Sequence, residues 1–295
     1  MWPHYCRVAL LLTCSWLTFD GLSHSASARP QALVCVEHVW CDIAQQIGGN
    51  ALHTTVLITA SGLDPHHLRP TPSLARTLSQ ADAVLLNGAT YDDWALSLIP
   101  QNVHLFNMAQ QEGNWRPGDD PHLFFDPKIV RHAAFNIAQW LITKDPDHAT
   151  EIKGRLDQFT EQTQKILIRL DHLKAHFQGT TIAITEPAGE RLLSYAGLTI
   201  VDRPWALAVM NENGISARDT ASLEENITQH KIRFLLVNPT VMAPEVETIK
   251  TLANAHHIPT IELGENLPTG QSWQGWMNHT LDDIEHALNR TALTP

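Results

Sequence analysis

The feature that most constrains this chain is a long amphipathic segment near its middle. It begins at Asp145-Pro146, a pair that favours a helix start, and ends before Gly179. Its apolar residues recur mostly at steps of three, four or seven, and comprise Leu156, Phe159, Ile166, Leu170, Leu173 and Phe177, interrupted only by Thr163. At 1.5 Å per residue, this segment predicts one helix of roughly 45 Å. That length is sufficient to link two lobes.

Strands and helices alternate on both sides of this segment. Strands are expected over residues 32–38, 53–58, 83–87, 103–107, 181–185, 199–201, 232–237 and 258–263. The other helices are expected over residues 40–48, 71–80, 91–98, 126–141, 190–196, 217–229, 245–255 and 272–290. Continuous apolar strands separated by helices are typical of parallel sheets covered on both faces. We therefore predict an α/β fold with two similar lobes, each a four-stranded mainly parallel sheet, joined by one long rigid helix.

This organisation divides the chain into four parts. We predict a leader over residues 1–28, an N-terminal lobe over 29–145, the linking helix over 146–178 and a C-terminal lobe over 179–295. The leader has the features of a secretory signal: Arg7, an apolar run over 8–19, and Ala26-Ser27-Ala28 as a cleavage site. The run is shorter than the ~20 residues that a membrane-spanning helix needs. We expect a cleaved signal peptide and a soluble protein in the periplasm.

Two Asp-Pro-His loops follow strands of the N-terminal half. Asp64-Pro65-His66 comes after the second expected strand, and Asp120-Pro121-His122 after the fourth. Proline restricts its own φ and the residue before it, so these loops are stiff. The carboxyl ends of parallel strands are where α/β proteins bind ligands. An isolated pair such as His66-His67 is more often a surface feature, but the second loop favours a function, with His67 as a rim residue.

Two carboxylates hold comparable positions in the C-terminal half. Glu186 directly follows a strand, and Glu265 follows the last strand. Two imidazoles and two carboxylates, His66, His122, Glu186 and Glu265, would neutralise and enclose a divalent cation between the lobes. On position alone, Glu186 also fits an ordinary strand-end carboxylate, and Glu262 and Asn266 compete with Glu265.

Other histidines have simpler explanations. His172 and His176 are spaced i, i+4 on the long helix and could chelate a metal, but a solvated helix face explains them better.

Cys6 and Cys14 belong to the leader, and Cys35 and Cys41 remain after its removal. In an oxidising compartment these two could form a disulfide, and two buried free thiols are an equal alternative.

Three motifs carry a family resemblance: Gly62-Leu63-Asp64-Pro65-His66 with Pro70-Thr71-Pro72-Ser73, Ala81-Asp82-Ala83-Val84-Leu85-Leu86-Asn87-Gly88, and Asp120-Pro121-His122-Leu123-Phe124-Phe125-Asp126-Pro127. They resemble the zinc/manganese-type solute-binding receptors of bacterial ABC importers, over essentially the whole mature chain. The resemblance implies metal binding between two α/β lobes. It assigns the first two family histidines to His66 and His122, and the third ligand, His or Glu in the family, to Glu186. The fourth, usually Asp, falls on Glu265. The long His-rich loop of some zinc receptors is missing from residues 110–119.

The donor set bears on which metal is bound. Two histidines and two carboxylates are harder than three histidines and one carboxylate, which favours Mn²⁺. The Irving–Williams order, in contrast, favours Zn²⁺ at almost any such site. We therefore expect one divalent transition metal ion, Zn²⁺ or Mn²⁺.

These observations predict a periplasmic receptor, not an enzyme, that delivers its metal ion to an ABC importer permease. The net charge of −11, with no basic run, argues against nucleic acid, and we expect a monomer. An exported metallohydrolase is the main alternative, but no His-Glu-x-x-His motif is present and the candidate ligands lie in separate loops. An adhesin-type protein is a second alternative. A receptor for a metal chelate is a third, with Trp94, Trp115 and Trp205 lining a larger pocket.

Overall fold

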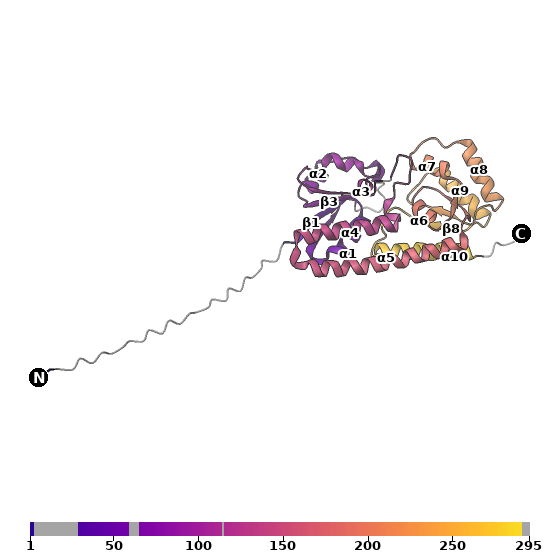
Figure 1. Cartoon of the computed structure of the whole chain (residues 1–295). Coiled ribbons are helices and arrows are strands. Elements are labelled where there is room, and N and C mark those ends of the chain that lie inside the picture. Colours follow the sequence, from indigo (N-terminus) through magenta and orange to yellow (C-terminus); the bar gives the residue numbers. More distant parts are fainter. Residues whose placement is uncertain (3–28, 59–64, 114, 291–295) are drawn as a thin grey trace.

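The computed structural model describes residues 1–2, 29–58, 65–113 and 115–290. Apart from Met1 and Trp2, the predicted leader lies outside the described residues, as does Asp64 of the first Asp-Pro-His loop. The chain forms two lobes, each built around a four-stranded parallel sheet (Figure 1). The predicted fold class is confirmed.

The sheet of the N-terminal lobe has the strand order β2-β1-β3-β4. Its strands are β1 (Gln31–Cys35), β2 (Leu52–Val56), β3 (Ala83–Leu86) and β4 (His104–Asn107). All four residues of the central strand β3 are buried and apolar, as a strand covered on both faces requires. The helices of this lobe are α1 (His38–Gly48), α2 (Pro72–Ser79), α3 (Met108–Glu112) and α4 (Pro127–Lys144).

The C-terminal lobe repeats this topology with the order β6-β5-β7-β8. Its strands are β5 (Thr181–Ile184), β6 (Thr199–Ile200), β7 (Leu235–Val237) and β8 (Thr260–Glu262). Its helices are α6 (Glu190–Tyr195), α7 (Arg203–Met210), α8 (Ala217–Thr228), α9 (Pro244–Ala255) and α10 (Trp273–Asn289). Because both sheets are parallel, all strand ends of one lobe open towards one edge, where the predicted ligands follow them.

Helix α5 (Ala149–Phe177) is the long helix that the apolar stripe predicts. It begins three residues later than expected, since residues 146–148 form a 3₁₀ turn. It packs against α1 and α4 of one lobe and against α6 and α10 of the other. Thr163, which interrupts the stripe, is buried, and its hydroxyl donates to the Phe159 carbonyl at 2.9 Å. The polar group is therefore satisfied within the helix.

Helix α10 is a second connection between the lobes and lies alongside α5 (Figure 1). Its first residue, Trp273, donates from its backbone N to Asp42 of α1 at 2.7 Å. The Trp273 indole donates to the Phe124 carbonyl, also at 2.7 Å. One apolar cluster extends through both lobes around these helices. After the second sheet is complete, the chain thus contacts the N-terminal lobe again. The predicted boundaries of the lobes and of the linking helix remain a prediction.

One local prediction is wrong. The helix expected over 91–98 is a 3₁₀ helix, Asp93–Leu98, because Ala89 and Thr90 have positive φ and Asp92 bonds back to the loop before it. Helices α3 and α7 were not expected from the sequence. Helix α7 has Pro204 in its first turn, where proline is well tolerated.

Two further features complete the fold. A disulfide joins Cys35 at the end of β1 to Cys41 in α1. Of the two alternatives open from the sequence, a disulfide or two free thiols, the structure has the disulfide. Among the described residues, none of the helices combines the length and the apolar character needed to span a bilayer.

Candidate metal centre

His66 lies on a short 3₁₀ turn, residues 65–67, in the connection between β2 and α2. The indole of Trp94 donates to the Pro65 carbonyl at 3.1 Å and fixes this turn. The His66 ring meets the edge of the Tyr91 ring at a centroid distance of 4.6 Å, and that of His122 at 5.8 Å. The loop that the prolines stiffen thus brings the His66 ring next to that of His122.

His122 is fully buried, and its orientation is set by Asp120. Asp120 Oδ1 lies 2.6 Å from His122 Nδ1 and also accepts from the His122 backbone N at 2.9 Å. The Asn87 amide donates to the Pro121 carbonyl at 2.8 Å and holds the same loop. With Nδ1 occupied, Nε2 of His122 is the atom that faces the junction of the lobes, 3.3 Å from Glu265 Oε2. A carboxylate behind a histidine is a common arrangement at metal centres.

Two residues not anticipated from the sequence hold the carboxylates. Asn238, directly after β7, donates from its amide to Glu265 Oε1 at 2.7 Å and to Glu186 Oε2. Its carbonyl oxygen accepts from Thr240, so the amide orientation is fixed. Tyr91 donates its hydroxyl to Glu265 Oε2 at 2.9 Å from the opposite lobe. Both glutamates are therefore held in place while buried.

Potential ligand atoms of His66, His122 and Glu265 all lie within 4.8 Å of one another. A metal ion with bonds of about 2.0–2.2 Å to nitrogen and oxygen could bridge such a group after small side-chain movements. Glu186 is outside this group of three, and Asn238 links it to Glu265. The structure thus brings three of the predicted ligands together and leaves Glu186 next to them. Its role as a ligand remains a prediction.

The charges of the centre are coupled. Burial lowers the pKa of His122, but Glu265 and Asp120 outweigh it and raise this pKa well above its ordinary value. Burial raises the pKa of Glu265, but His122 and then His66 outweigh it and lower the pKa to about 2. Burial, and then the charge of Glu265, raises the pKa of Glu186 well above its ordinary value. The raised pKa values of His122 and Glu186 favour their protonated forms, which reduce the buried negative charge.

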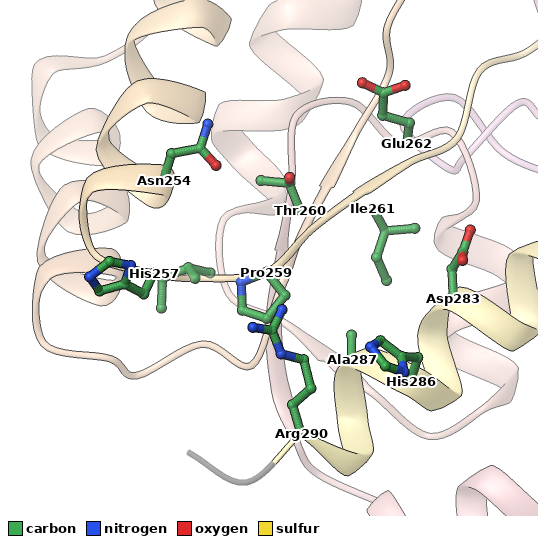
Figure 2. Close-up of a pocket in the computed structure, with 11 residues that line it drawn as sticks. Asn254, His257, Pro259, Thr260, Ile261, Glu262, Asp283, His286, Ala287 and Arg290 are labelled. Atoms are coloured by element: carbon green, nitrogen blue, oxygen red, sulfur yellow. The ribbon is translucent and has the colours of Figure 1, made fainter. Parts of the chain in front are cut away.

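Glu262, a competitor of Glu265 in the sequence, lies elsewhere. It lines an open hollow of about 460 Å³ beside the edge strand β8, together with Asp283, His286 and Arg290 (Figure 2). Its side chain is exposed, whereas Glu265 is only 5% exposed. Glu262 is thus not part of the group formed by His66, His122 and Glu265.

The three tryptophans considered for a larger solute pocket occupy different places. Trp94 bonds to the Pro65 carbonyl, Trp205 is fully buried in an apolar cluster of the C-terminal lobe, and Trp115 lines a groove beside Asp120 and Arg191. They do not form the wall of one chelate site.

The chain is similar to known proteins over most of its length. A family model described as "ZnuA: Zinc-uptake complex component A periplasmic" matches residues 33–287. The manganese ABC transporter substrate-binding lipoprotein PsaA of Streptococcus anginosus is 24% identical over 314 residues, covering 97% of each chain. The metal ABC transporter substrate-binding lipoprotein FimA of Streptococcus parasanguinis is 24% identical, covering 95% of this chain and 94% of the relative.

Solved structures show the same fold. The periplasmic zinc-binding protein TroA from Treponema pallidum superposes with a TM-score of 0.74 at 19% identity, covering 88% of this chain and all of the other. The Zn(II)-bound ZnuA-like domain of Streptococcus pneumoniae AdcA has a TM-score of 0.68 at 17% identity, covering 88% and 98% of the two chains.

Proposed function

Because the chain belongs to the ZnuA family of periplasmic zinc-uptake components, we propose that it is the metal receptor of an ABC importer. It captures one divalent transition metal ion between its lobes and delivers the ion to the membrane permease. The observation that carries this proposal is the convergence of half-buried His66 with buried His122 and Glu265 at the lobe junction. We propose these residues and Glu186 as the ligands of the transported ion.

The centre fits capture of a cation better than catalysis. Each candidate ligand has a supporting partner: Trp94 fixes the loop of His66, Asp120 orients His122, and Asn238 holds both glutamates. Binding requires neutral imidazoles and ionised carboxylates, so the incoming ion displaces the protons of His122 and Glu186. The family membership places the chain among transport components. Metallohydrolase activity has no corresponding observation in its favour.

The lobes are joined by α5 and also by the N-terminal turn of α10, so we propose that capture involves small movements of loops rather than a wide hinge closure. Release then follows from tilting of the lobes on the permease. A large difference in solution scattering between metal-free and metal-loaded protein would contradict this mechanism.

The metal is Zn²⁺ or Mn²⁺. The two carboxylates favour Mn²⁺ among nitrogen- and oxygen-ligated ions, and the Irving–Williams order favours Zn²⁺. The curated relatives are named for manganese, and the solved structures include zinc-binding proteins. Competition between the two ions for one apo-protein sample will assign the preference.

The receptor works outside the cytoplasm, as a monomer and without nucleic acid. Its relatives are named as periplasmic proteins or lipoproteins, and the apolar run over 8–19 is consistent with export.

A growth experiment tests the proposed function. Cells that lack the gene should need more Zn²⁺ or Mn²⁺ in a metal-depleted medium. Wild-type protein should restore growth, and His122→Ala should not. Restoration by His122→Ala at equal protein levels would overturn the proposed function.

A further inference from the structure

The loop that carries His122 is held by two arginines of the opposite lobe. Arg191 of α6 donates to the Asp120 carbonyl from Nε at 3.0 Å and from Nη2 at 2.6 Å. Arg203 of α7 donates to the Gly118 carbonyl at 2.7 Å and pairs with Glu190 at 2.6 Å. Residues 118–122 are thus attached to the C-terminal lobe at two points.

Only one of these attachments reaches the candidate metal centre. The backbone N of Arg191 donates to Asp120 Oδ2 at 3.2 Å, while Oδ1 of the same carboxylate bonds to His122. Asp120 therefore connects the C-terminal lobe, through one carboxylate, to the imidazole of His122. Asp120 is buried, so water does not readily replace these bonds. Arg203 touches neither Asp120 nor His122 among its bonds in the structure.

We infer that Arg191 is an interlobe positioning residue that controls how long the bound metal ion is retained. While the lobes are in contact, Arg191 fixes the backbone of Asp120, and Asp120 fixes the His122 ring. When the lobes tilt apart, the guanidinium leaves the Asp120 carbonyl, the loop relaxes, and the imidazole loses the orientation that ligation needs. This inference rests on the proposed function and adds the step that couples lobe movement to release.

The position of Arg191 suits this role. It lies in a groove of about 470 Å³ at the lobe junction, with about a fifth of its side chain exposed to solvent. A guanidinium that bonds a carbonyl through two nitrogens loses both bonds together when the surfaces separate. The group is thus held firmly in the closed arrangement and is quickly solvated when that arrangement opens.

The test is the rate at which loaded protein loses metal to an excess of chelator, measured by stopped flow. Arg191→Ala should lose Zn²⁺ or Mn²⁺ about tenfold faster than wild type. This is the low end of the 10–100-fold in affinity that loss of the partner behind a ligating histidine, here Asp120, commonly costs, because the backbone N of Arg191 still donates to Asp120 Oδ2 in the variant. Arg203→Ala is the matched control. It frees the same loop at Gly118 and should change the rate by less than about twofold. The thermal unfolding of both apo-variants reports whether a general loss of stability explains the result.

The double variant Arg191→Ala/Asp120→Asn separates positioning from stability. If Arg191 acts through Asp120, the double variant should lose metal no faster than Asp120→Asn alone. If Arg191→Ala does not fold, Arg191→Gln keeps much of the side chain and gives the same comparison. Equal rates for the Arg191 and Arg203 variants, or multiplicative effects in the double variant, would overturn the inference. Absence of metal binding by wild-type protein would overturn the proposed function instead.

Discussion

Nε2 of His122 lies 3.3 Å from Oε2 of Glu265, although the two residues come from different lobes. The ion pair they form lies within the group of side chains proposed to bind the metal ion. It also explains why the pKa of Glu265 is about 2 despite burial, and why that of His122 is well above its ordinary value. In the metal-free protein, a proton on His122 supplies the positive charge that the cation supplies in the loaded protein.

Metal binding should therefore release protons. In the metal-free protein, Glu265 and Asp120 raise the pKa of His122 well above its ordinary value, and burial raises that of Glu186; both shifts favour the protonated forms, and ligation removes these protons. Affinity should rise with pH through neutrality and continue to rise above it. Calorimetry in buffers of different ionisation enthalpy should give at least one proton released per ion, and Glu186→Gln should release fewer. A pH-independent affinity without proton release would contradict this account.

Asn238 should be important for the stability of the metal-free protein. Asn238→Ala leaves buried oxygens of Glu186 and Glu265 without their amide donor, which typically costs about 1–3 kcal/mol. Urea unfolding of apo-protein at pH 7 measures this loss. Asn254→Ala, at an exposed position near the end of α9, serves as the control and should have little effect. Equal stability of the two variants would show that the glutamates do not depend on Asn238.

Asp202 should make stability fall as pH rises, independently of the metal. Burial raises the pKa of Asp202 to about 8, although the backbone N of Ile184 donates to it. Between its ordinary pKa of about 3.9 and pH 8, the folded state holds a proton that the unfolded state lacks. Its stabilising contribution is complete below pH 4 and is lost through pH 8, at up to about 1.4 kcal/mol per pH unit.

Asp202→Asn should remove this contribution, so its unfolding free energy should depend less steeply on pH than that of wild type. Urea unfolding of apo-protein between pH 5 and 8 measures both slopes. Asp157→Asn on the exposed face of α5 should keep the wild-type slope. Identical slopes for wild type and Asp202→Asn would show that Asp202 is ionised in the folded protein.

The two-lobe fold was predictable because its determinants are local. The inner strands β3 and β7 are short apolar runs, and α5 shows its apolar stripe within one continuous segment. The strand ends also located His66, His122 and Glu265, because parallel strands open towards a common edge. The alternation of side chains along β8 could have favoured Glu265 over Glu262 as the candidate ligand. Ile261 and Leu263 point inwards, as Glu265 does, whereas Glu262 points outwards.

The groups behind the ligands could not be predicted in the same way. Tyr91 and Asn238 act through contacts with Glu265 that depend on how two lobes and two loops meet. Arg191 contacts Asp120 only because α6 lies against the loop before α4. No spacing within one segment indicates such partners. They follow from the tertiary arrangement alone.

The central claim is that residues from both lobes hold one metal ion. Its most direct test is metal analysis by mass spectrometry of protein purified without chelators. Wild-type protein, and His132→Ala at an exposed site paired with Glu112, should retain about one equivalent of Zn²⁺ or Mn²⁺. His122→Ala and Glu265→Ala, folded by circular dichroism, should lose most of it. An undiminished metal content in either of these two variants would contradict the account.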